Sequence, residues 1–145
     1  YNASKTLKYL VSDNEIYGND ENGVQLISGY SSVTNRAFWI QRNLIYNNAF
    51  SGIGCMGGVN TKENFEGASL LEKIYIFNNT IVGNDHGITG GDNLVAVNNI
   101  IANHNKGIKN INGNSIVAHC DIFNNGVDVE NSNLDTPTIL YTDPL

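Results

Sequence analysis

The hexapeptide Asn79-Thr80-Ile81-Val82-Gly83-Asn84 recurs 19 residues later as Asn98-Asn99-Ile100-Ile101-Ala102-Asn103. Both segments have the form Asn-x-Ile-φ-x-Asn, in which φ is an apolar residue. Further copies begin at Asn14 and Asn43, and a degenerate fifth copy begins at Cys120. A Gly-Val or Gly-Ile pair follows every copy. The chain is therefore built from an internal repeat of one short unit.

Three apolar columns run through the five copies, and all their members are valine or isoleucine. The first column precedes the motif isoleucine by five residues and contains Val11, Ile40, Ile76, Val95 and Val117. The second is the motif isoleucine itself, at Ile16, Ile45, Ile81, Ile100 and Ile122. The third follows the glycine, at Val24, Ile53, Ile88, Ile108 and Val127. Because β-branched residues favour strands, each repeat is predicted to contain three short strands.

The repeat length indicates how these strands are arranged. The two shortest repeats span 19 and 22 residues, which suffices for three strands and three turns. A chain that repeats three strands winds into a solenoid, in which each strand pairs with its counterpart one coil on, about 4.8 Å away. Equivalent asparagines would then form side-chain ladders. The sequence predicts an all-β parallel β-helix of about five to six coils, with two long loop insertions at residues 25–39 and 54–75.

Composition limits the size and the partners of the protein. The 145 residues and 15.8 kDa fit a single domain, residues 1–145. The formal net charge of −6 argues against binding to nucleic acid or to an anionic membrane surface. No apolar run approaches the ~18 residues of a membrane-spanning helix. The 25 asparagines and 15 glycines are residues that accept left-handed backbone, as tight turns require.

The two Asn-Asn segments, together with the ending Thr142-Asp143-Pro144-Leu145, resemble the right-handed parallel β-helix (pectate-lyase-like) superfamily. The two Asn-Asn segments look like the repeats of large secreted bacterial β-helix proteins. This resemblance implies a right-handed solenoid and an extracellular or cell-surface location. The superfamily includes polysaccharide lyases, glycoside hydrolases and adhesins, so the resemblance does not choose an activity. Its usual capping helix is not visible, so we expect a segment of a longer protein, or ends covered by self-association.

The two insertions suggest where a ligand would bind. Both lie between the third and first columns of neighbouring coils, so they should stand together at one corner beside the third-column strands. Residues that alternate with the buried third column, such as Gln25, Thr89 and Lys109, should form the floor of a groove there. A polysaccharide or oligosaccharide is the expected ligand, because aromatic side chains beside a shallow floor suit a sugar chain. The predicted substrate-binding residues are Tyr30, Gln25, Thr89, His86, Phe65 and Lys73.

The candidate catalytic residues are Lys109, His104, Asp85 and Asp128. A β-eliminating lyase needs a base, for which Lys109 is the best placed, and a cation such as Ca²⁺ that neutralises a uronate carboxylate. Asp85 and His104 are predicted to occupy one repeat position in adjacent coils, and Lys109 and Asp128 another. The alternatives are a solvated turn pair for the former and a surface ion pair for the latter. The acidic residues are scattered along the sequence, and no set of metal ligands can be recognised in it.

Two hypotheses for function follow. The first is a carbohydrate-interacting protein, similar to a polysaccharide lyase or glycosidase, with a groove on one sheet. The alternative is a non-catalytic structural, adhesin or glycan-binding β-helix segment.

Cys55 and Cys120 belong to coils three apart, about 14 Å at the strand spacing, which exceeds the reach of a disulfide. Both cysteines are therefore predicted to be free thiols.

Overall fold

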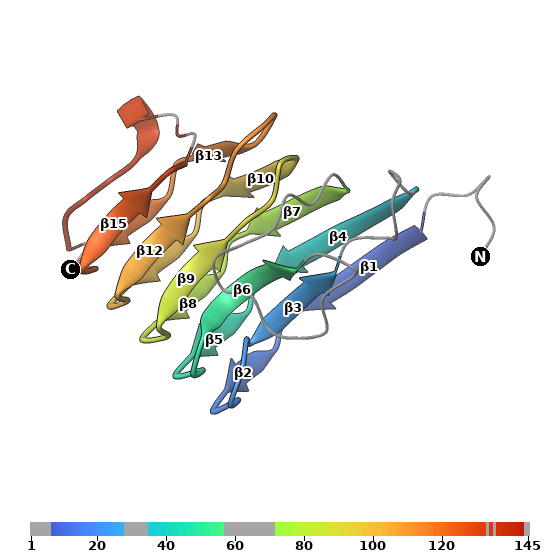
Figure 1. Ribbon diagram of the computed structural model, residues 1–145, viewed down its shortest axis with the longest axis horizontal. Coiled ribbons are helices and arrows are strands. Elements are labelled where there is room, and N and C mark those ends of the chain that lie inside the picture. The colour runs from blue at the N-terminus through green and yellow to red at the C-terminus, as the bar shows by residue number, and fades with distance from the viewer. Residues whose placement is uncertain (1–6, 28–34, 57–71, 133, 135, 144–145) are drawn as a thin grey trace.

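The computed structural model describes residues 7–27, 35–56, 72–132, 134 and 136–143. Within them the chain forms three parallel five-stranded sheets, each of which takes one strand from every coil (Figure 1). The first sheet consists of β1 (Leu7–Ser12), β4 (Arg36–Gln41), β7 (Lys73–Phe77), β10 (Leu94–Val97) and β13 (Ile116–Ala118). The second consists of β2 (Glu15–Tyr17), β5 (Leu44–Tyr46), β8 (Thr80–Val82), β11 (Ile100–Ala102) and β14 (Asp121–Phe123). The third consists of β3 (Val24–Ile27), β6 (Ser51–Met56), β9 (His86–Thr89), β12 (Lys106–Lys109) and β15 (Val127–Glu130).

This arrangement is a parallel β-helix of five coils with three strands per coil, and it confirms the predicted fold class. A short 3₁₀ turn, η1 (Thr136–Thr138), follows the last coil. The described ends of the chain lie at opposite ends of the solenoid (Figure 1). In the described part of the chain, no helix has the length and apolarity to cross a membrane.

Stacked isoleucines fill the centre of the solenoid. In the second sheet Ile45 pairs with Ile81, and in the third sheet Ile53 pairs with Ile88, which pairs with Ile108. All of these side chains are fully buried. Because each coil presents the same residue at the same place, like side chains pack on like side chains without a gap. The predicted columns are correct through the first three coils.

In the fourth coil the first two columns differ from the predicted register by one residue, whereas the predicted Ile108, Val117 and Ile122 are in line with the core. Ile101, not Ile100, pairs with Ile81, and Ala96, not Val95, pairs with Ile76. The reason lies in the Asn98-Asn99 doublet, in which Asn98 has a φ of 56° and forms the left-handed turn. The same turn position is held by Asn78, so Asn99 is the residue equivalent to Asn79. The motif match at Asn98 was one residue too early.

In the fifth coil the third column is also displaced. Ile108 pairs with Val129, whereas the predicted Val127 pairs with Lys106 and is exposed. The fourth and fifth coils are related by a constant offset of 21 residues, which also joins Ile101 to Ile122. The Gly126-Val127 pair is therefore not equivalent to the Gly-Ile pairs of the earlier coils. Asp128 is the residue equivalent to Gly107.

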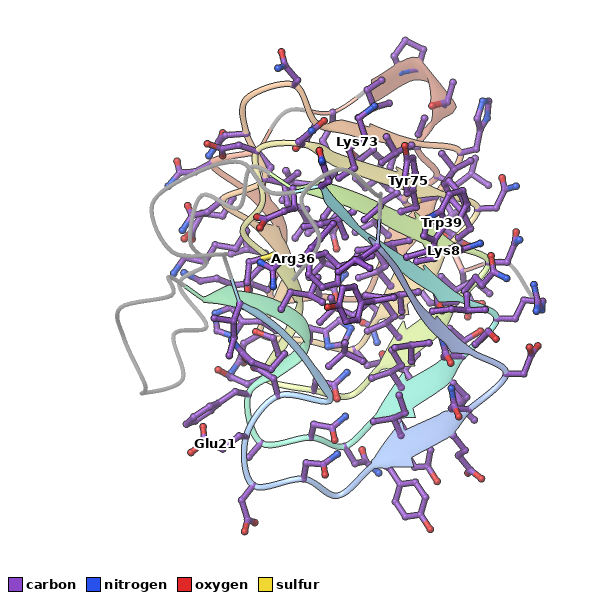
Figure 2. The ribbon with its side chains drawn as sticks, turned by 90° about the vertical axis from the view of Figure 1, so that its right-hand side faces the viewer. Lys8, Glu21, Arg36, Trp39, Lys73 and Tyr75 are labelled. Carbon is purple, nitrogen blue, oxygen red and sulfur yellow. The ribbon has the colours of Figure 1, made fainter. Side chains whose placement is uncertain are left out.

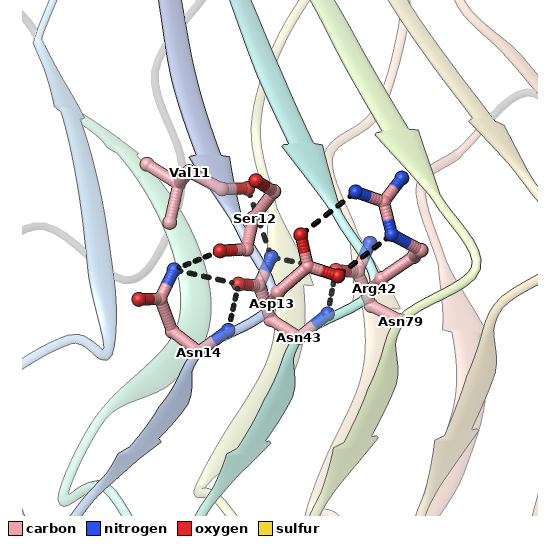
Figure 3. Close-up of polar contacts among 7 residues, drawn as sticks. All are labelled: Val11, Ser12, Asp13, Asn14, Arg42, Asn43 and Asn79. Atoms are coloured by element: carbon pink, nitrogen blue, oxygen red, sulfur yellow. Dashed lines mark hydrogen bonds and ion pairs between the residues drawn. The ribbon is translucent and has the colours of Figure 1, made fainter.

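Asparagine ladders connect the coils at two turns. At the first turn, Asn43 Nδ2 donates to Asn79 Oδ1 at 3.0 Å, and Asn79 Nδ2 donates to Asn99 Oδ1 at 3.0 Å. Each side chain also receives a bond from the backbone N–H of the previous coil, as Asn79 does from Asn43 (3.0 Å). Figure 3 shows the start of this ladder, with the ion pair of Asp13 and Arg42 beside it. The ladder satisfies the polar backbone that the turns would otherwise leave unpaired inside the protein.

Candidate functional site

The predicted floor is the side of the third sheet that faces away from the isoleucine core. Gln25 pairs with Gly54, Gly54 with Thr89, and Thr89 with Lys109, so these four share one line across four coils as expected. The fifth member of the line is Glu130, which pairs with Lys109. The predicted member, Asp128, is two residues away. It accepts a 2.8 Å hydrogen bond from Asn125 Nδ2.

The expected pairing of Lys109 with Asp128 is therefore wrong, because the fifth coil is displaced in register. Lys109 Nζ lies 3.6 Å from Glu130 Oε1, and Lys106 Nζ lies 2.7 Å from Glu130 Oε2. The hydrogen bond from Lys106, helped by the charge of both lysines, lowers the pKa of the Glu130 carboxyl. Glu130 is the residue that sequence reasoning missed here.

The floor is closed to solvent at its centre. Thr89 is 0% exposed, Lys109 6% and His86 5%. Ser51 is also fully buried, and its Oγ lies at hydrogen-bond distance, 3.1 Å, from Thr89 Oγ1. The open, shallow floor expected from the sequence is therefore not present at these residues. The proposed role of Lys109 as a base stays a prediction.

The described ends of the two insertions do meet at one corner, as predicted. Arg36 lies near the end of the first insertion, and Glu72 lies near the end of the second. Arg36 Nη2 lies 2.6 Å from Glu72 Oε1 and donates to the carbonyl of Ile27 at 3.1 Å. Tyr30 and Phe65, the aromatic residues predicted to bind substrate, lie outside the described residues.

Asp85 and His86 form a close pair at the start of β9. His86 Nδ1 lies 2.8 Å from Asp85 Oδ2. Burial lowers the pKa of the His86 imidazole, and the neighbouring Asp85 carboxylate opposes that effect. The amide of Asn105 donates to the Asp85 carboxylate, so Asn105 is the residue equivalent to Asp85 in the next coil. His104 is not, and the predicted Asp85–His104 equivalence is wrong by one position.

His104 belongs instead to the second asparagine ladder, which runs through Asn19, Asn48 and Asn84. Asn48 Nδ2 donates to Asn84 Oδ1 at 2.8 Å, and Asn84 N donates to His104 Nδ1 at 3.1 Å. His104 is buried, and burial is the main cause of a lowered pKa for its imidazole. Its position in the turn gives it a structural role.

An aromatic cluster lies on the outer side of the first sheet. The rings of Trp39 and Tyr75 are 4.3 Å apart between centroids, and the ring of Phe77 contacts both at 6.0 and 5.8 Å. Lys8 Nζ lies 4.3 Å from the centre of the Trp39 ring. Figure 2 shows Lys73, Tyr75, Trp39 and Lys8 in succession along one side of the solenoid. We call Trp39, Tyr75 and Phe77 the aromatic strip.

The aromatic strip continues into aliphatic residues along the solenoid axis. Leu10 pairs with Trp39, Tyr75 with Val95, and Val95 with Ile116. Leu10 is 52% exposed and Ile116 51%, while Trp39 and Tyr75 are half-buried. Alternation about Ile40 and Ile76 could have placed Trp39 and Tyr75 outward. Of the predicted binding residues, Lys73 was expected in the loop wall formed by the second insertion; it is exposed and begins β7 of this sheet.

Neither cysteine takes part in a disulfide, which agrees with the prediction. Both are buried, and burial raises the pKa of the Cys55 thiol to about 12. A thiol that is protonated at neutral pH is a poor nucleophile. Among the residues described, no three His, Cys, Asp or Glu side chains are grouped so as to hold a metal ion.

No protein-family model, curated protein or solved structure matches the chain. The parallel β-helix is therefore established by the strand pairing itself.

Proposed function

We propose that this β-helix is a non-catalytic glycan-binding segment that holds a polysaccharide against the aromatic strip. The single observation that carries the proposal is the partly exposed pair Trp39 and Tyr75, whose rings contact each other at a tilt in adjacent coils on the outer side of the first sheet. Aromatic faces contact the C–H groups of a pyranose ring, which is how proteins commonly hold sugars. The resemblance of the repeat to pectate-lyase-like proteins supports a carbohydrate ligand.

The spacing of the rings supports a chain rather than a single sugar. Adjacent coils lie about 4.8 Å apart, which is close to the length of one pyranose unit. A glycan that runs along the solenoid axis would therefore place successive units over Leu10, Trp39, Tyr75 and Val95. Such a ligand is met by a preformed surface, since β4, β7 and β10, which carry Trp39, Tyr75 and Val95, are paired on both sides.

The charges beside the aromatic strip favour an acidic glycan. Lys8 and Lys73 are exposed on the same sheet, in a protein whose net charge is −6. A local cationic site in an acidic protein would select a uronate or another anionic sugar over a neutral one. A polysaccharide of this kind belongs to an extracellular or cell-surface setting, which is the location we propose.

Lyase or glycosidase activity is less well supported than binding. Lys109, the proposed base, is buried and lies beside Glu130. A base must reach the proton that it removes. The test is absorbance of unsaturated uronates during incubation with polygalacturonate, with and without Ca²⁺. Turnover that is lost in Lys109→Ala would replace the binding proposal with a catalytic one.

Binding is measured directly because Trp39 is the only tryptophan of the chain. Polygalacturonate, an acidic glycan, is titrated into the protein while the fluorescence of Trp39 is followed, and neutral dextran serves as the comparison. Tyr75→Ala should weaken binding roughly three- to tenfold, as expected for the loss of one stacking ring. Lys73→Ala should reduce the preference for the acidic glycan.

Tyr46→Ala is the matched control, because Tyr46 also stacks on a neighbour, Tyr17 at 5.0 Å, but on the second sheet. This variant should bind the glycan as the wild type does. A spectrum that no polysaccharide changes, or an equal loss in Tyr46→Ala and Tyr75→Ala, would contradict the proposal and leave a purely structural segment.

A further inference from the structure

A cleft lies over the outer side of the second sheet, where the chain after η1 returns to the last coil. Its lining includes Ile100, His119, Asp121, Pro137 and Leu140. The returning segment is held in place by backbone hydrogen bonds: Ile122 N donates to Leu140 O at 2.8 Å, and Leu140 N donates to Cys120 O at 3.0 Å. The N–H of His119 also donates to Thr138 Oγ1 at 3.0 Å. The wall of the cleft is thus part of the fold.

Asp121 lines this cleft, and one of its two carboxylate oxygens has no hydrogen-bond partner. The residue is only 8% exposed, and its Oδ1 has no hydrogen-bond partner. At the equivalent position of the neighbouring strands stand Ile100 and Thr80, which carry no charge. A buried carboxylate oxygen without a donor is costly, and such an atom in a folded protein calls for an explanation.

The surroundings of Asp121 indicate which kind of group would pair with its carboxylate. Burial and the charge of Asp143 raise the pKa of the Asp121 carboxyl, so its ionised form lacks stabilisation in the protein alone. A bound cation would stabilise the ionised carboxylate. The cleft walls formed by Ile100, Pro137 and Leu140 are apolar, which suits a cation attached to a hydrocarbon body. The acidic protein as a whole, with a net charge of −6, also attracts cations.

A metal ion fits this cleft poorly. Ca²⁺ takes six to eight oxygen ligands. Among the described residues no three acidic, histidine or cysteine side chains converge to hold a metal. The side chain of Asn99, which also lines the cleft, is already committed to the first ladder, where it donates to Ile76 O at 2.8 Å.

We propose that this cleft binds an aliphatic ammonium group, with the carboxylate of Asp121 as its counter-ion and Ile100 and Leu140 against its hydrocarbon chain. The ammonium group would donate to the Asp121 carboxylate and supply the opposite charge that this carboxylate lacks. The same chemistry is offered by a free alkylamine and by the side chain of lysine in a peptide. The site lies on the second sheet and is independent of the glycan surface proposed for the first.

The test is a titration of the whole chain with n-butylammonium chloride, followed by the methyl NMR signals of Ile100 and Leu140. A second arm uses the tripeptide Gly-Lys-Gly, a third uses CaCl₂, and NaCl at matched ionic strength is the blank. We expect saturable shifts with n-butylammonium that the blank does not produce, and a lowered pKa of Asp121 in the ¹³C carboxyl titration. Tighter binding of the tripeptide than of the amine would identify lysine as the natural source of the ammonium group.

Asp121→Asn keeps the shape of the side chain and should weaken n-butylammonium binding at least tenfold. Asp128→Asn, which removes one carboxylate from the third sheet, is the control and should bind as the wild type does. Absence of saturable shifts in the wild type would overturn the proposal without reference to any variant. Binding of Ca²⁺ in preference to the amine, or equal losses in the two variants, would overturn it as well. Trp39 fluorescence in the presence of polygalacturonate should be unaffected throughout, so this test and that of the glycan surface fail separately.

Discussion

The imidazole of His104 takes the place of an asparagine side chain against Asn84. Its Nδ1 lies 3.1 Å from the backbone N of Asn84, and its Nε2 lies 3.0 Å from the carbonyl oxygen of Ile81. In the coil before, Asn84 makes the same two contacts, since its Oδ1 accepts from Asn48 N at 2.9 Å and its Nδ2 donates to Ile45 O at 3.4 Å. Nδ1 also lies 3.0 Å from the carbonyl oxygen of Asn84. With its proton on Nε2 alone, the imidazole accepts from Asn84 N and donates to Ile81 O as an asparagine would, whereas a proton on Nδ1 would replace the first contact by donation to Asn84 O.

His104→Asn is expected to fold and to reduce the acid sensitivity of the protein. Burial lowers the pKa of His104 in the folded state, so protonation favours the unfolded chain. The stability is therefore complete above the ordinary histidine pKa of about 6.5, and falls as the pH drops from there towards the folded-state pKa. Urea unfolding at pH 7.5, 6.0 and 5.0 measures this loss, which should be smaller in the variant.

His86 should also lose stabilising free energy as the pH falls, because burial lowers its pKa too. His104→Asn should therefore remove only part of the dependence of stability on pH. His119→Asn, at an exposed position, is the control and should retain the wild-type profile. An unchanged pH profile in His104→Asn would show that the imidazole is not held neutral by the ladder.

Ile100 and Ile101 form a matched pair for testing the register of the fourth coil. Ile101 is fully buried and stacks between Ile81 and Ile122, whereas Ile100 faces outward. Ile101→Ser should lower the free energy of unfolding by about 3–5 kcal/mol, through lost packing and a buried hydroxyl. Ile100→Ser should cost less than about 1 kcal/mol. The reverse order in urea unfolding would restore the register expected from the motif.

Asn79→Ala tests the contribution of the first ladder. The change removes the acceptor used by Asn43 N and Nδ2, and the donor to Ile40 O at 3.0 Å. Because these partners are buried, the free energy of unfolding should fall by about 2–4 kcal/mol. Asn114→Ala, which changes an exposed asparagine, should leave the free energy of unfolding nearly unchanged. Thermal or urea unfolding measures both variants. Equal effects would mean that the ladder adds nothing beyond an ordinary turn residue.

The cysteines should react with a thiol reagent only after unfolding. Cys55 and Cys120 are buried, and burial raises the pKa of each thiol, that of Cys55 to about 12. Ellman's reagent should therefore detect no fast-reacting thiol in the native protein and two in guanidinium without reductant. In the denatured variant Cys55→Ala the reagent should detect one thiol. Detection of none in the denatured wild type would require a disulfide, and hence a different stacking of the coils.

The repeat could be predicted in detail because its causes are local. At the first turn of the second, third and fourth coils a left-handed residue, such as Asn78, is followed by a ladder asparagine and two residues later by a buried isoleucine, all within four positions. The columns through Ile45, Ile81 and Ile53 were therefore correct. Where the local signal was doubled, as in Asn98-Asn99, the motif fitted in two registers, and the errors at Val95, Ile100 and the Asp85–His104 pair all follow from that choice.

The sequence by itself determined the fold class, the number of strands per coil and the lines of residues shared between coils, because stacking forces equivalent residues into contact. Only the tertiary structure decided which outward residues remain open. Thr89 and Lys109 alternate with the core just as Trp39 and Tyr75 do, yet the former are buried and the latter partly exposed. Likewise Asp121 is an ordinary outward position until Leu140 folds beside it. Alternation specifies which side of a sheet a residue occupies, whereas exposure depends on what distant parts of the chain lay over that side.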